Sequence, residues 1–162
     1  MNIFRINTVQ QLKILIFVIL PPISLLLFIF YFELFNIFVF IPFGILLILD
    51  TLPSILLHIN YYKANNGVTL TINKDENLLF YDSKDRFIES SLSKISCICL
   101  ILSTVYYTGR HSFGQYRYCK IVLIDGTEIV INCLMINDIE NTLVDLLDVK
   151  PLVERRLLCF IK

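Results

Sequence analysis

Two long apolar runs occupy the first third of the chain, and a short polar break separates them. The first run, residues 14–32, carries no charge, and the second, residues 34–59, carries only Asp50. A helix made of either run is long enough to cross the roughly 30 Å hydrocarbon core of a bilayer. The pattern therefore predicts two membrane-crossing helices, with a turn marked by Glu33 and Asn36.

A cleaved signal peptide is the alternative for the first run, because Arg5 and Lys13 precede it. The run is longer than the apolar region of such a peptide and has no small-residue cleavage site. Neither run shows a polar face, as a helix at the surface of a soluble core would. We therefore predict a transmembrane hairpin over residues 1–62, with spans of about 12–32 and 34–58.

The basic residues predict the orientation of this hairpin. Arg5 and Lys13 flank the first run and Lys63 follows the second, whereas the connecting turn holds no basic residue. Since cytoplasmic segments carry the excess of Lys and Arg, we predict a multi-pass protein of the cytoplasmic (inner) membrane with both termini cytosolic. Five cysteines without regular spacing fit reduced thiols on that side.

Two features inside the apolar runs have a functional and a structural interpretation. Pro21 and Pro22 predict a kink in the first helix, either a tolerated one or a break used for gating or binding. Asp50 is a costly acid inside a span and suggests ion or proton handling. Alternatively, Lys13 pairs with it, or the second span ends there.

The remaining residues, 63–162, change to the period-two alternation of half-buried strands. Val68, Leu70 and Ile72 alternate with threonines, and Asp125-Gly126 is a strong signal for a tight hairpin. The pattern predicts about six or seven short antiparallel strands. The segments are 68–72, 78–81, 86–89, 95–107, 116–124 and 128–131.

One helix is expected after the strands. Asn137 is a candidate N-cap with Glu140 three residues later, and apolar residues follow at helical spacing up to Leu147. Its apolar face must pack on the sheet. The tail, residues 151–162, is either a partner- or membrane-binding helix or an element that completes the domain.

This order of elements resembles a known family. The resemblance rests on residues 68–72, on 121–131 and on the helix at 136–147, and it covers residues 65–148. In these segments the chain looks like the bacterial pleckstrin-homology-like (PH-like) membrane proteins of the YcxB-like kind. The resemblance implies an α+β domain of 63–162, a small bent antiparallel sheet or barrel capped by a C-terminal helix. It also implies a binding module without catalytic residues.

The residues themselves offer little support for catalysis. His58 and His111 have no serine or cysteine partner at a recognisable spacing, and no glycine-rich phosphate loop is present. Cys97 and Cys99 share one face of a strand and suggest either a metal or redox pair or ordinary core packing. We therefore predict no enzyme activity, no metal and no cofactor. The balanced charge also argues against nucleic acid as a partner.

The most suggestive cluster is basic and aromatic and lies between two predicted strands. We take six of its members, together with the intramembrane Asp50, as candidate site residues for a protein or lipid partner. The cluster comprises Tyr106, Tyr107, Arg110, His111, Phe113, Tyr116, Arg117, Tyr118 and Lys120. The six candidates are Tyr107, Arg110, His111, Phe113, Tyr116 and Arg117. An exposed hairpin of ordinary composition is the alternative interpretation.

Three hypotheses for function follow. The first is a non-enzymatic, membrane-anchored module that presents a PH-like domain to a protein or lipid partner at the cytoplasmic face. The second is an immunity or inhibitor protein against a membrane-acting toxin. The third is a transporter or channel subunit that uses Asp50 and the proline break. The expected partners are the lipid bilayer and either another protein or further copies of the chain.

Overall fold

A computed structural model describes residues 1–31, 37–108 and 111–161 of the chain. The helices are α1 (Thr8–Tyr31), α2 (Ile37–Asn65) and α3 (Ile139–Leu147), with short 3-10 turns η1 (Leu92–Lys94), η2 (Tyr106–Thr108) and η3 (Ser112–Gln115). The strands are β1 (Asn2–Arg5), β2 (Thr69–Asn73), β3 (Leu78–Asp82), β4 (Phe87–Ser91), β5 (Ile95–Ser103), β6 (Tyr118–Leu123), β7 (Glu128–Asn132) and β8 (Leu152–Arg156).

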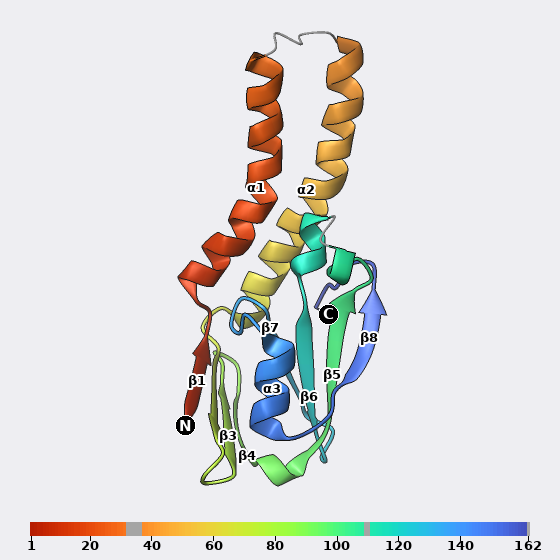
Figure 1. Cartoon of the computed structure of the whole chain (residues 1–162). Helices are drawn as coiled ribbons and strands as arrows, with labels where there is room; N and C mark the ends of the chain where they lie inside the picture. Colours follow the sequence, from red (N-terminus) through yellow and green to blue (C-terminus); the bar gives the residue numbers. More distant parts are fainter. Residues whose placement is uncertain (32–36, 109–110, 162) are drawn as a thin grey trace.

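Helices α1 and α2 form a long hairpin that projects from the sheets (Figure 1). Helix α1 contains Pro21 and Pro22 and bends part-way along its length, as two missing backbone donors predict. Helix α2 does not end at Asp50 but continues past the predicted boundary at 58 to Asn65. The predicted turn at Glu33 and Asn36 lies outside the described residues.

The hairpin is inserted between the first two strands of the sheet domain and does not precede it. Strand β1 pairs antiparallel with β2, with Asn2 opposite Ile72 and Arg5 opposite Thr69. Residues 2–5 fall within the predicted hairpin of 1–62, because four residues are too few to display a period-two pattern. Both ends of the hairpin therefore rejoin the same sheet.

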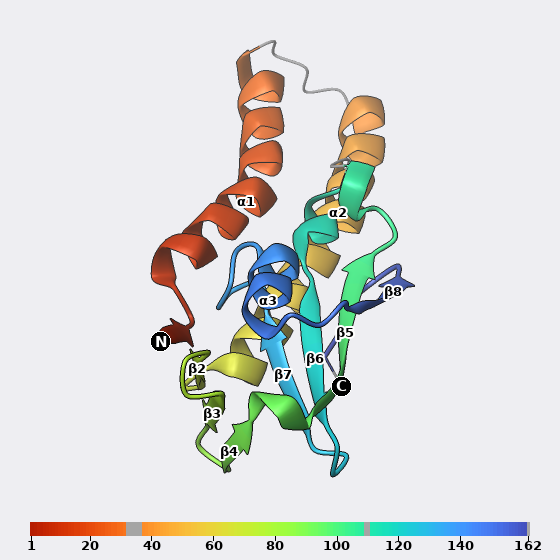
Figure 2. The ribbon, with the colours of Figure 1, turned by 60° about the horizontal axis from the view of Figure 1, so that its bottom comes forward.

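The eight strands form two four-stranded sheets and not a closed barrel. One sheet has the order β1-β2-β3-β4 and the other β7-β6-β5-β8, and Figure 2 shows α3 lying over them. The antiparallel pairing of β2 to β4 and of β5 to β7 is as expected. The tail contributes β8, which pairs parallel to β5. This resolves the open alternatives for residues 151–162 in favour of a strand, followed by residues that pack on α2.

The main core lies between the two sheets and α3. Ile139, Leu143 and Leu147 fall on one face of α3 and are buried against strand residues such as Leu100 and Ile121. The helix begins one residue later than predicted, because the side chain of Asp138 accepts from the Asn141 amide as the N-cap.

A second core joins the base of the hairpin to the sheet domain. Leu57 and Tyr61 of α2 have no exposed surface, and Ile14 and Val18 of α1 are almost as deeply buried. They pack with aromatic residues of η3 and β6 and with Cys159 near the C-terminus. The hairpin and the sheet domain are therefore one folded unit.

The outward faces of both helices are apolar and exposed. Leu12, Leu27, Leu46, Leu49 and Leu56 each expose roughly half of their surface or more. By length and composition, both helices could cross a membrane. Exposed apolar surface on this scale indicates contact with lipid or with another protein.

Candidate functional site

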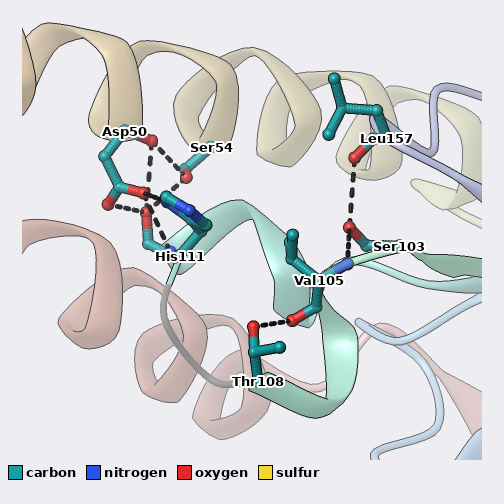
Figure 3. A network of polar contacts seen from close by, with 8 residues as sticks. Asp50, Ser54, Ser103, Val105, Thr108, His111 and Leu157 are labelled. Carbon is teal, nitrogen blue, oxygen red and sulfur yellow. Dashed lines mark hydrogen bonds and ion pairs between the residues drawn. The ribbon is translucent and has the colours of Figure 1, made fainter.

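The candidate site lies where helix α2 meets the segment that leads from β5 to β6. Asp50 occupies the middle of α2 and faces this segment (Figure 3). The Ser112 hydroxyl donates to Asp50 Oδ2 at 2.8 Å, and the Ser112 amide donates to Oδ1 at 3.3 Å. His111 Nδ1 lies 3.1 Å from the same Oδ1. The carboxylate is thus held by a segment sixty residues away in the chain.

Two further contacts join α2 to the same segment, one and two turns after Asp50. We call this contact between α2 and residues 111–117 the seam. Ser54 Oγ donates to the Asp50 carbonyl at 2.9 Å and lies 2.6 Å from Ser112 Oγ. His58 Nδ1 lies 3.1 Å from the Tyr116 hydroxyl. Residues 50, 54 and 58 are each four apart, so they form one polar stripe along α2.

The base of α2 is fixed by contacts to the C-terminal segment and to β7. Asn60 forms two hydrogen bonds with the backbone of Ile161, at 3.1 and 2.8 Å. The Tyr61 hydroxyl donates to the Cys159 carbonyl at 2.8 Å. The Asn132 side chain donates to the Tyr61 carbonyl at 2.7 Å. Since the two bonds of Tyr61 are buried, they are costly to leave unmade.

The seam is stabilised by aromatic packing in a region of low polarity. The Tyr61 ring meets those of Tyr116 and Tyr118 edge to face, with centroids 5.4 and 6.1 Å apart. Burial raises the pKa of Tyr116 well above its ordinary value, and it raises the pKa of Cys159 to about 11. These groups are therefore neutral at physiological pH and serve as packing and hydrogen-bonding residues.

Two neighbouring surface grooves lie at the foot of the hairpin. The larger, of about 450 Å³, is lined by residues that include Arg5, Gln11 and Tyr62. The smaller, of about 230 Å³, includes Lys63 and Lys84 and shares Tyr62 with the first. Three basic residues thus surround the point where the hairpin joins the sheet.

Comparison with known proteins identifies the family. A family model described as "PH domain" matches residues 3–142. The chain belongs to the PH domain family. No curated protein and no solved structure matches it. The narrower resemblance to the YcxB-like membrane proteins remains a prediction.

The matched region of this PH domain begins within β1 and includes the whole hairpin. This agrees with the pairing of β1 and β2, which places the hairpin inside the domain. The predicted division at residue 62 separated two parts that share a sheet and a core.

The six predicted contact residues of the PH domain differ in their exposure. Phe113 and Tyr116 are buried against α2 and its surroundings, so in this fold they do not form an exposed contact face. His111 is about half exposed, stacks on Phe113 with ring centroids 5.0 Å apart, and bonds Asp50. Arg110 lies outside the described residues, and the side chain of Tyr107 is likewise not described. A contact role for this cluster remains a prediction.

Arg117, the sixth predicted residue, is also used internally. Its guanidinium lies 4.9 Å from the centroid of the Tyr106 ring, donates to the Asn137 carbonyl and reaches the Gln115 carbonyl at 3.3 Å. These contacts tie the segment after β5 to the start of α3. Arg117 is therefore a structural residue of the PH domain in this conformation.

Asp50 contacts other residues than the predicted one. A pair with Lys13 was one predicted alternative, whereas the structure pairs Asp50 with His111 and Ser112. Ser54 and Ser112 carry no sequence signal of their own. The four-residue spacing of Asp50, Ser54 and His58 was an available signal, since it is the polar stripe of an otherwise apolar helix.

The side chains that could bind a metal ion lie apart in the described part of the PH domain. Within residues 1–31, 37–108 and 111–161, no three His, Cys, Asp or Glu side chains are placed to hold a metal ion. Cys97 and Cys99 lie partly exposed on β5, where burial and the neighbouring Cys97 raise the pKa of Cys99. A raised pKa lowers the thiolate fraction, which disfavours metal or redox chemistry at this pair.

Replacing Asp50 with alanine should loosen the segment between β5 and β6 from α2. We expect a loss of about 2 kcal/mol, because hydrogen bonds to a charged group contribute more than neutral ones. The measurement is the rate of cleavage by trypsin, which cuts after Arg110 and Arg117, together with the unfolding temperature in detergent. Asp75→Ala, in the exposed turn between β2 and β3, is the matched control and should leave both unchanged. Equal cleavage of the two variants would contradict a clamping role for Asp50.

Proposed function

We propose that the chain is a non-enzymatic binding module anchored in the cytoplasmic membrane. In this proposal the hairpin inserts into the bilayer with both termini on the cytosolic side. The PH domain is held at the inner face, where it binds a protein or lipid partner. PH domains are typically binding modules for lipids or proteins, which supports the second half of this proposal.

The observation that carries the proposal is the exposed apolar hairpin inserted between β1 and β2. Its outward side chains are leucine, isoleucine, valine and phenylalanine along most of the two helices. A soluble monomer rarely exposes an apolar patch of this extent. A bilayer removes this surface from water without requiring a partner of matching shape.

The cytosolic orientation is supported by the charges at the base of the hairpin. Arg5, Lys13 and Lys63 lie at this end, and Lys84 lines the adjoining groove. Basic residues favour the cytoplasmic face, where they also meet anionic headgroups. The five cysteines, none of which is paired in a disulfide, agree with this side.

The contacts of Asp50 favour an anchor over a pathway for ions. A carboxylate that takes part in transport must exchange ligands with water or with the cargo. Asp50 instead receives two hydrogen bonds from Ser112 and faces His111. Its role in this proposal is to hold the PH domain against the hairpin.

The test is flotation with vesicles of phosphatidylcholine and phosphatidylglycerol. The full chain should float with the vesicles and resist extraction by carbonate. A variant that lacks the distal hairpin, residues 24–46, replaced by a flexible linker, should lose its resistance to carbonate extraction. If the full chain stays soluble without detergent, the anchoring half of the proposal is wrong. Copurification from solubilised membranes then tests whether the PH domain retains a specific partner.

A further inference from the structure

The hairpin is short above the PH domain. From Ile37 to Asp50, where Ser112 docks, helix α2 rises only about 20 Å. The hydrocarbon core of a bilayer is about 30 Å thick, and any tilt of the helix reduces its reach further. The helix gains the missing distance only at about Leu57, roughly two turns beyond Asp50 and alongside the folded domain.

The exposed apolar surface continues along this part of both helices. Leu52, Ile55, Leu56 and Ile59 of α2 expose between 41% and 51% of their surface on the side away from the sheets. On α1, Val9, Leu12 and Ile16 are similarly exposed below the level of the proline bend. The exposed apolar surface therefore extends beyond Asp50 towards the base of the hairpin.

Basic residues mark the lower limit of this surface. Lys63 follows Ile59 by one turn of α2, and Lys13 lies among the exposed apolar residues of α1. On the sheet side, Arg156 Nη1 lies 3.4 Å from the Tyr118 hydroxyl, and the Tyr118 ring packs on Tyr61. Arg156 is itself paired with Glu154 at 2.7 Å, so Lys13 and Lys63 are the basic residues at this end of the hairpin that can meet anionic headgroups.

The segment that docks on Asp50 is suited to partial immersion. We define the docking segment as residues 103–108 and 111–117. Several of its hydroxyl groups bond within the chain, and Figure 3 shows two of them: Ser103 donates to the Leu157 carbonyl at 3.1 Å and Thr108 to the Val105 carbonyl at 2.8 Å. Ser112 donates to Asp50. A polar group in an apolar medium needs such internal partners.

The absence of acidic residues from the sequence around the docking segment also favours contact with a membrane surface. Residues 90–124 contain no aspartate or glutamate. A stretch that meets an anionic membrane surface avoids like-charge repulsion by lacking acids. Of the acids beside this segment, Asp50 accepts two hydrogen bonds from Ser112, and Glu154 of β8 is paired with Arg156 at 2.7 Å.

We propose that the docking segment is sunk into the cytoplasmic-side interface of the bilayer, so that the lipid surface meets the protein at the level of Leu57 and not at Asp50. The docking segment then covers Asp50, and Leu157 together with the lower outward faces of α1 and α2 contacts lipid. This inference rests on the proposed membrane anchoring and deepens it by assigning a second bilayer contact, made by the PH domain itself.

The test uses the absence of tryptophan from the chain, because each introduced tryptophan is then the sole reporter. The full chain is reconstituted in vesicles of phosphatidylcholine and phosphatidylglycerol whose acyl chains carry bromine, which quenches nearby indoles. The probes are Thr108→Trp, Leu157→Trp and Leu56→Trp. Phe30→Trp in the distal hairpin is the membrane reference, and Ile124→Trp, at the opposite end of β6 from the hairpin, is the water reference. Circular dichroism checks that each variant is folded.

The expected result is loss of most emission for Phe30→Trp, Leu56→Trp and Leu157→Trp, and no quenching for Ile124→Trp. Thr108→Trp should be quenched best by lipids brominated near the headgroup. If Leu56→Trp is shifted to the blue but not quenched, a protein surface such as a second copy covers it, and the inference is overturned. Quenching of Phe30→Trp alone also overturns it while leaving the anchor intact. Failure of Phe30→Trp to be quenched would instead reject the proposed anchoring.

Discussion

A fragment of residues 65–162 is expected not to fold, although it contains all but one of the strands. The fragment lacks β1, whose pairing with β2 spans Asn2 to Arg5, and it lacks the base of the hairpin. Ile14, Val18, Leu57 and Tyr61 are all buried in the second core. At about 1.5–3 kcal/mol for each buried side chain, their loss removes roughly 6–12 kcal/mol. This equals the whole stability of a typical domain.

The matched control keeps these contacts and removes only the distal hairpin. Deletion of residues 24–46 with a flexible linker retains β1, the base of both helices and Asp50. This variant should show a cooperative thermal transition and dispersed amide signals by NMR, whereas the fragment should show neither. A well-folded fragment 65–162 would show that the sheets do not depend on the hairpin.

The second large effect is expected at Tyr61. Its side chain is completely buried, packs edge-on with Tyr116 and Tyr118, and donates to the Cys159 carbonyl. Replacement of a buried aromatic residue by alanine costs about 3–5 kcal/mol. For a chain of this size, the midpoint of thermal unfolding in detergent should fall by roughly 10 °C.

Two companion variants separate packing from hydrogen bonding. Tyr61→Phe keeps the ring and loses only the bond to the Cys159 carbonyl, so a cost of about 1 kcal/mol is expected. Tyr62→Ala changes the adjacent, exposed tyrosine and should cost less than about 0.5 kcal/mol. Similar shifts for Tyr61→Ala and Tyr62→Ala would contradict the assignment of Tyr61 to the core.

The elements with regular periodicity were predictable from the sequence. The apolar runs gave both helices, and the alternation around Leu70 gave β2. The Asp125-Gly126 turn joins β6 and β7, with Gly126 at a φ of 83°, the left-handed conformation that glycine adopts without strain. These features depend on neighbouring residues, so a local pattern is sufficient to identify them.

The features that depend on distant pairing could not be predicted in this way. Strand β1 acquires its identity only from β2, and β8 acquires its parallel partner from β5 across the end of the domain. Phe113 and Tyr116 are buried because α2 packs on them, and no local sequence pattern predicts this contact. The same holds for the site, where Asp50 is conspicuous in an apolar run but Ser112 is an ordinary serine.

The position of the hairpin between β1 and β2 has a consequence for biosynthesis. A ribosome makes β1 first, but its partner strand emerges only after both long helices have been made. Until then, residues 2–5 have no strand of their own sheet to pair with. Strand β1 is therefore fixed late in folding, because its pairing with β2 requires that the two ends of the hairpin have come together.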